Sequence, residues 1–121
     1  HNCTFELMHC NSSYPMSPVE ANLNCIKSLR EKFKCNVGYS GHESLGYLIC
    51  TTAVVLGATS IERHISIDRS MYGSDQPASL EEKGLARLVR DIRLIDTILG
   101  DGTKKIWPSE IPVMKKLRAD N

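Results

Sequence analysis

The sequence predicts an α/β protein in which parallel strands alternate with helices. Three short runs with strand character are each followed by a polar segment and then by an amphipathic helix. Successive strand runs are separated by the length of a β-α unit, and such units form parallel sheets. Both an open doubly wound sheet and a (β/α) barrel are built in this way. A closed TIM barrel has eight units, so if the fold is a barrel, these three units form only a part of it.

The first unit is predicted as a strand over Phe5–His9 and a helix that begins near Ser17. The segment Ser17–Glu20 has the pattern of a capping box, with proline at the first helical position. Apolar residues then recur at spacings of three and four and predict one buried face. These residues are Val19, Leu23, Ile26, Leu29 and Phe33.

The second unit is predicted as a strand over Asn36–Ser40 and a helix over about Glu43–Leu56, which ends at Gly57. Its apolar and small residues predict the face that is turned toward the core. They are Leu45, Leu48, Ile49, Thr52, Ala53 and Leu56.

The third unit is predicted as a strand over Ser60–Ile65 and a helix that ends at Gly100. A second capping box, Ser79–Glu82, marks the start of this helix. The residues expected to be buried are Leu85, Leu88, Val89, Ile92, Ile95 and Leu99.

The remaining segment, residues 101–121, contains Pro108 and Pro112 and shows no strong hydrophobic period, so a tail or linker is predicted there. Residues 1–100 are then expected to form a single core, which is one portion of a barrel if the barrel interpretation holds. The chain begins on a strand-like segment without an initiator methionine, and we expect further sequence upstream.

Composition argues against several classes of partner. Fifteen basic residues nearly balance fourteen acidic ones, and no basic run is interleaved with aromatic residues, so a nucleic-acid-binding surface is not expected. The longest apolar stretch, Thr52–Ala58, is too short to span a bilayer, and a cytoplasmic protein without membrane contact is predicted. The five cysteines form no C-x-x-C pair and are expected to be reduced thiols.

Polar side chains follow the predicted strands, where the reactive groups of α/β proteins gather. Alternation along a strand places Glu62 and His64 on one side, and Ser40 and His42 share a side if the extended backbone continues. Two histidines from neighbouring strands then meet at one edge, and neutral imidazoles are common metal ligands. A single histidine at a strand end is more often an ordinary polar residue than a metal ligand, and Glu62 could be a carboxylate that pairs with Arg63 or another cation.

Taken together, these segments resemble the sialic acid synthase family over nearly the whole chain. The order and spacing of the matching segments make the resemblance specific. They are Leu7-Met8-His9-Cys10-Asn11-Ser12-Ser13-Tyr14-Pro15, Val37-Gly38-Tyr39-Ser40-Gly41-His42-Glu43, Leu56-Gly57-Ala58-Thr59-Ser60-Ile61-Glu62-Arg63-His64-Ile65, Asp68-Arg69-Ser70 with Gly73-Ser74-Asp75-Gln76, and Pro108-Ser109-Glu110.

The resemblance implies the sixth, seventh and eighth units of a (β/α) barrel, followed by a linker toward a small antifreeze-like domain. It implies that His42 and His64 hold a divalent metal, manganese or magnesium, and that Glu62 is a catalytic carboxylate beside it. The substrate contacts it implies are Ser12 and Ser40 for phosphoenolpyruvate, and Tyr14 and Asp75 for the amino sugar.

The activity implied is a metal-dependent condensation of phosphoenolpyruvate with N-acetylmannosamine or a related N-acylated amino sugar, which gives a sialic-acid-type nonulosonate and phosphate. The complete enzyme is expected to be a homodimer. Two alternatives remain open at this point: another metal-dependent aldol-type barrel enzyme, or a half-barrel that is not catalytic and associates through its open sheet edges. The resemblance places a phosphate-binding lysine on earlier strands, so this chain alone is expected to be inactive.

Overall fold

The computed structural model describes residues 3–45 and 47–117 and contains a three-stranded sheet. The strands β1 (Glu6–Cys10), β2 (Asn36–Gly41) and β3 (Ile61–Arg63) lie in the order β1-β2-β3, and both pairs are parallel. The predicted alternation of parallel strands and helices is therefore confirmed. The observed β3 is shorter than its predicted range, because beyond Arg63 the chain leaves β2 and makes only an isolated bridge from Ile65 to Leu80.

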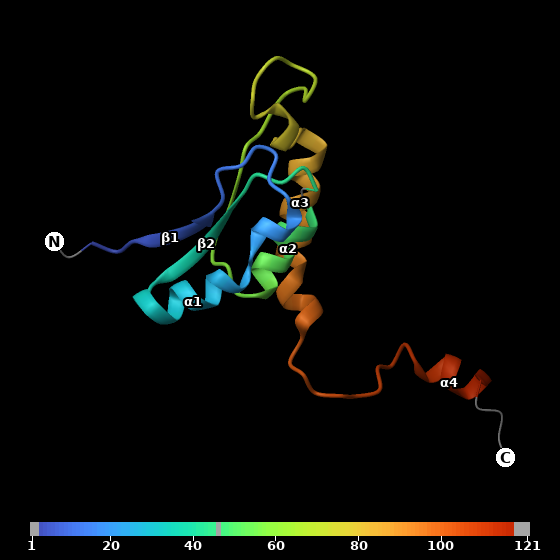
Figure 1. Ribbon diagram of the computed structural model, residues 1–121. Helices are drawn as coiled ribbons and strands as arrows, with labels where there is room; N and C mark the ends of the chain where they lie inside the picture. The colour runs from blue at the N-terminus through green and yellow to red at the C-terminus, as the bar shows by residue number, and fades with distance from the viewer. Residues whose placement is uncertain (1–2, 46, 118–121) are drawn as a thin grey trace.

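Three helices connect and cover the strands. They are α1 (Asn24–Phe33), α2 (Tyr47–Val55) and α3 (Glu82–Leu99). The helices α1 and α2 contact β2, and α3 packs on α2, so the sheet, α2 and α3 form successive layers (Figure 1). No helix in the described part of the chain is long and apolar enough to cross a membrane.

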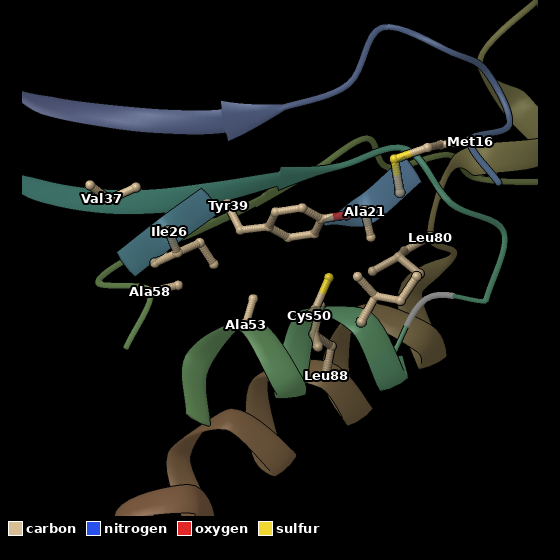
Figure 2. Close-up of a cluster of buried hydrophobic side chains, with 11 residues drawn as sticks. Met16, Ala21, Ile26, Val37, Tyr39, Cys50, Ala53, Ala58, Leu80 and Leu88 are labelled. Atoms are coloured by element: carbon tan, nitrogen blue, oxygen red, sulfur yellow. The ribbon is translucent and has the colours of Figure 1, made fainter. Parts of the chain in front are cut away.

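The core lies between one face of β2 and the helices. Figure 2 shows the side chain of Tyr39 leaving β2 on the side of the helices, and Val37, two residues earlier, is buried on the same face. Ile26 of α1 and Cys50 of α2 are fully buried against them. Because side chains alternate across a strand, the intervening residues of β2 face the opposite side of the sheet, which these helices leave uncovered.

The first predicted helix is divided in two. Its capping box begins a 3-10 turn, η1 (Pro18–Ala21), in which the Glu20 carboxylate accepts a 2.9 Å hydrogen bond from the Ser17 backbone N–H. Asn22 then adopts a left-handed conformation with φ of 37°, and a regular helix resumes only at Asn24. The break rotates the face: Val19 is 84% exposed, and the prediction that it is buried is wrong.

The second predicted helix begins four residues later than expected, at Tyr47. Its inward face consists of Ile49, Cys50 and Ala53. The predictions that Leu45, Leu48, Thr52 and Leu56 are buried are wrong, because all four are exposed. Apolar residues occur all around this helix, so the pattern did not define one face.

The third predicted helix begins at Glu82, with Glu81 rather than Ser79 as its N-cap. Ser79 instead ends a short 3-10 turn, η2 (Gln76–Ala78), and is buried. Two further predictions of burial fail here and one fails on α1. The exposed residues are Val89, Leu99 and Phe33.

The predicted tail contains a short helix, α4 (Ile111–Leu117), that the sequence pattern did not predict. In Figure 1 an extended segment separates α4 from the rest of the chain. None of the α4 residues is buried. The assignment of residues 101–121 as a linker stays a prediction, and residues 118–121 lie outside the described part.

Candidate functional site

The candidate site lies at the carboxyl ends of β2 and β3, on the face of the sheet opposite the helices. Register places Cys10, Ser40 and Glu62 side by side across the three strands. The Ser40 hydroxyl donates a 2.8 Å hydrogen bond to the Glu62 carboxylate. Ser40 is buried and Glu62 is exposed, so the carboxylate is accessible while one of its oxygens is held in place.

His42 follows β2 and is only 3% exposed. Its Nδ1 lies 2.5 Å from the backbone carbonyl oxygen of Asn11. Because a carbonyl oxygen only accepts hydrogen bonds, this contact requires the proton on Nδ1. The neutral ring then has its lone pair on Nε2, the arrangement in which a histidine can bind a metal. In this structure the Tyr14 hydroxyl lies 3.1 Å from Nε2 and donates to it.

His64 follows β3, and its ring centre lies 5.2 Å from that of His42 with the planes nearly perpendicular, at 88°. The Tyr14 ring contacts both imidazoles, with centroid distances of 4.2 Å to His42 and 5.4 Å to His64. Burial, with the Cys10 thiol and the Asp75 and Glu62 carboxylates, raises the pKa of the Tyr14 hydroxyl above its usual value. Tyr14 therefore acts here as a neutral hydrogen-bond donor.

Asp75 approaches the same cluster from the loop between β3 and α3. Its Oδ2 lies 3.6 Å from Nδ1 of His64, and both side chains are partly exposed. A carboxylate beside one ring nitrogen orients the imidazole and leaves the other nitrogen available. The loop thus lies against the histidine pair rather than pointing away from it.

The structure gathers six of the seven predicted site residues around these two strand ends. The six are Tyr14, Ser40, His42, Glu62, His64 and Asp75. Ser12 lies exposed in the loop after β1, between Asn11 and Tyr14. The roles of all seven residues stay predictions.

The residues present fit a divalent metal only in part. The described ranges, 3–45 and 47–117, contain no group of three or more His, Cys, Asp or Glu side chains arranged to hold an ion. The histidine pair, with the Nε2 lone pair of His42 directed into the cluster, supplies two suitable nitrogens. A metal held here would need further ligands from water, substrate or other parts of a complete protein.

Sequence reasoning missed a buried ion pair directly behind the site. The guanidinium of Arg63 lies 2.5 Å from the carboxylate of Glu43, on the helix-covered side, so Arg63 does not pair with Glu62 as one interpretation held. Burial raises the pKa of the Cys50 thiol to about 12, with a further contribution from the Glu43 carboxylate. The same two causes raise the pKa of Tyr39. The available signal was Glu43, directly after His42 at the end of a strand, but the sequence pattern predicted Glu43 as the first residue of a helix.

Comparison with known proteins decides the family. The NeuB family model matches residues 1–104. The chain belongs to the NeuB family. It is 44% identical over 117 residues to N-acetylneuraminate-9-phosphate synthase from Mus musculus, which covers 96% of this chain and 32% of the relative. It is 41% identical over 112 residues to N,N'-diacetyllegionaminic acid synthase from Legionella pneumophila, covering 93% and 31%.

Solved structures agree with this membership of the NeuB family. The sialic acid synthetase of Leptospira borgpetersenii, crystallised with citrate, superposes with a TM-score of 0.74 at 41% identity, covering 96% of this chain and 41% of that chain. A spore coat polysaccharide biosynthesis protein from Bacillus subtilis gives a TM-score of 0.75 at 33% identity, covering 85% and 29%. The predicted family is confirmed. The chain spans about a third of the length of the curated relatives it matches.

Proposed function

We propose that this chain forms part of the active site of a synthase that condenses phosphoenolpyruvate with an N-acylated amino sugar to give a nonulosonate and phosphate. The observation that carries the proposal is the histidine pair, in which the Asn11 carbonyl fixes the proton of His42 on Nδ1 and turns the Nε2 lone pair toward the cluster that contains His64. The names of the relatives, synthases of N-acetylneuraminate 9-phosphate and of diacetyllegionaminic acid, support a sugar substrate.

His42 and His64 are the residues that would hold the metal, manganese or magnesium, and a divalent ion supplies Lewis acidity toward a carbonyl oxygen. Tyr14 then has to give up its hydrogen bond to Nε2, which frees its hydroxyl for the sugar. Asp75 would keep the ring of His64 oriented from the loop side.

The reaction forms a carbon–carbon bond between the methylene carbon of phosphoenolpyruvate and the aldehyde carbon of the open-chain sugar. Water adds to the carbon that bears the enol phosphate, and the carbon–oxygen bond to phosphate then breaks. The accessible carboxylate of Glu62, held by Ser40, is suited to take the proton of that water or to stabilise positive charge on the same carbon. Ser12 and Ser40 are the proposed contacts of phosphoenolpyruvate.

The proposal includes a partial barrel. The helices leave uncovered the face of the sheet that bears Ser40 and Glu62, and the outer edges of β1 and β3 would pair with strands that precede this chain in a complete enzyme. A cytoplasmic location, a homodimeric enzyme and a linker at residues 101–121 belong to the same proposal.

The test restores a complete enzyme by joining this chain to the part of the mouse synthase that precedes the matched segment. We expect this joined protein to release phosphate only when phosphoenolpyruvate and an amino sugar are both present, with N-acetylmannosamine and its 6-phosphate assayed in parallel. A chelator should stop the reaction and manganese should restore it. Phosphate release without a sugar would mean that phosphoenolpyruvate is hydrolysed to pyruvate, and condensation of the sugar with pyruvate without phosphate release would favour another aldol-type enzyme. Either result would contradict the proposal.

The same assay on the chain alone measures how much of the site it holds. We expect no detectable turnover, because positioning and charge stabilisation account for many orders of magnitude in rate and the chain holds only one part of the site. Turnover by the chain alone would show that the site is complete without the preceding strands.

A further inference from the structure

A second cluster of polar side chains lies directly behind the candidate site, on the helix-covered face of the sheet. Glu43 is fully buried, and the side chain of Arg63 is only 3% exposed. Besides the 2.5 Å contact with Arg63, the Glu43 carboxylate accepts a 3.1 Å hydrogen bond from the Tyr39 hydroxyl and a 3.5 Å one from the Cys50 thiol. The buried carboxylate is therefore fully partnered, as a buried charge must be.

Arg63 also joins three separate segments of backbone. Its Nη2 donates 2.6 Å and 2.8 Å hydrogen bonds to the carbonyl oxygens of Glu43 and Ala78. Each of these segments holds a site residue close by in the sequence. Glu43 directly follows His42, Arg63 directly precedes His64, and Ala78 ends the turn that begins after Asp75.

Alternation connects the two clusters. Neighbouring residues of an extended chain point to opposite faces, so a side chain that is fixed on the helix side fixes the direction of its neighbour on the open side. Arg63 is fixed by one ion pair and two hydrogen bonds. The backbone that presents His42 and His64 is thus held from behind at both strand ends.

Gly41 shows how closely the ion pair fits against β2. A Cβ atom at this position would lie 2.6 Å from Nη1 of Arg63 and 2.8 Å from Oε2 of Glu43. Both neighbours are buried side chains that cannot move into solvent. Glycine at position 41 therefore makes room for the ion pair.

We propose that Arg63 and Glu43 are positioning residues, which set the spacing and direction of the two imidazoles and of the Asp75 loop without contacting substrate or metal. This inference rests on the proposed function where it concerns metal binding. It extends that function by assigning the geometry of the site to a buried pair on the opposite face. Residues that orient metal-binding histidines typically change metal affinity by about 10- to 100-fold when they are lost.

The test separates positioning from stability with the double variant Glu43→Met/Arg63→Met. Replacing both charges of a buried pair by apolar residues of similar size is often neutral for stability, whereas removing one leaves an unpaired charge. We expect the double variant to remain folded but to bind Mn²⁺ about tenfold more weakly, as measured by electron paramagnetic resonance titration of the 121-residue chain and of the joined protein.

A second measurement does not depend on metal. The imidazole rings of His42 and His64 lie 5.2 Å apart, within reach of a nuclear Overhauser effect between their ring protons. We expect this effect in the unaltered chain and its loss or weakening in the double variant. One outcome is that the unaltered chain shows the Overhauser effect while neither the unaltered 121-residue chain nor the unaltered joined protein binds Mn²⁺. In that case the proposed function fails, and the change of the Overhauser effect in the double variant alone decides the positioning role.

An exposed ion pair supplies the matched control. Lys27 and Glu31 lie 3.9 Å apart on α1 with side chains that are 79% and 64% exposed, so Glu31→Gln should change neither measurement. If the double variant does not fold, Arg63→Lys replaces it. Lysine keeps the charge but has a single nitrogen, which cannot lie beside the Glu43 carboxylate, as Nη1 of Arg63 does, and also donate to the two carbonyls, as Nη2 does. We therefore expect about threefold weaker Mn²⁺ binding. Unaltered Mn²⁺ affinity and an unaltered Overhauser effect in a folded variant would overturn the proposal.

Discussion

The two faces of the sheet are formed by the same strands but differ in their side chains: one face packs into the core, and the other carries the polar residues of the candidate site. On the side of the helices, Val37 and Tyr39 are fully buried and belong to the core. On the opposite side, Ser40 and Glu62 form a hydrogen-bonded polar pair with an accessible carboxylate. Because the side-chain period of a strand is two, stability and chemistry are assigned to alternate residues of one short segment.

The faces also treat charge differently. Behind the sheet, Glu43 and Arg63 neutralise each other where water is excluded. In front of it, Glu62 and Glu6 accept hydrogen bonds from hydroxyl groups and stay accessible. A substitution behind the sheet should therefore act mainly on folding or geometry, and one in front mainly on activity.

Among substitutions that test this difference between the two faces, His64→Ala in the joined protein should have the largest effect, a loss of condensation activity. We expect the condensation rate to fall by at least about a thousandfold, because losing a metal ligand removes several kcal/mol of transition-state stabilisation. The melting temperature should change by no more than about 2 °C, since His64 is partly exposed and contributes little to the core.

His9→Ala is the matched control for this variant. The His9 ring lies on the helix side, near Tyr39, and bonds to the Ala21 carbonyl oxygen at 2.7 Å. Its loss should lower the melting temperature while the rate per folded molecule stays unchanged. A reversed outcome for the two histidines would contradict the assignment of the faces.

Next in size is the loss of a core side chain. Ile26 is completely buried, and Ile26→Ala should lower the free energy of unfolding by about 2 to 4 kcal/mol. Met8 lies on the open face and is 37% exposed, so Met8→Ala should cost about 1 kcal/mol or less. Denaturant titrations of both variants measure this difference, and equal costs would mean that the open face is packed as tightly as the core.

The periodic features of the fold were predictable from the sequence, and the junctions were not. The three parallel strands and the burial of Ile26 and Ala53 follow from local periodicity, which the structure retains. The break at Asn22 and the late start of α2 at Tyr47 do not follow from periodicity. They depend on tertiary contacts, because the backbone around Glu43 is used to bury an ion pair rather than to begin a helix.

The candidate site was partly predictable for a related reason. Strand alternation and the rule that chemistry gathers at strand ends brought His42 and His64 into one hypothesis, and the structure brings their rings together. The Asn11 carbonyl and the Arg63 bridge were not predictable, since backbone acceptors are the same in every residue and leave no signal in sequence.

Alanine substitutions at two glycines of β2, Gly41 and Gly38, compare the packing of the two faces of the sheet within one strand. A Cβ at Gly41 meets the buried Arg63–Glu43 pair, whereas a Cβ at Gly38 meets the Ser60 hydroxyl and the flexible end of Met8 on the open face. Gly41→Ala should therefore cost about 2 to 3 kcal/mol of unfolding free energy, and Gly38→Ala about 1 kcal/mol. Thermal unfolding of the two variants checks this order, and a larger cost at Gly38 would show that the open face is the more rigid one.

The smallest expected effect concerns the pH dependence of the open face. The Glu6 carboxylate accepts hydrogen bonds from the hydroxyls of Thr59 and Ser60, and these two bonds lower its pKa below the ordinary value of 4.5. A depressed pKa in the folded state means that the carboxylate stabilises the fold above that value and loses this contribution as the pH falls through the lower, folded pKa. The melting temperature of Glu6→Gln should thus lie slightly below that of the unaltered chain at about pH 6 and converge with it near about pH 3.

Removing the first donor with Thr59→Val should shrink the pH-dependent part of this difference, because the hydroxyl that lowers the pKa of Glu6 most is then absent. Thermal scans of the unaltered chain, Glu6→Gln, Thr59→Val and the double variant Glu6→Gln/Thr59→Val across this range measure the effect. A difference that widens as the pH falls would mean that Glu6 stabilises the fold in its protonated form instead.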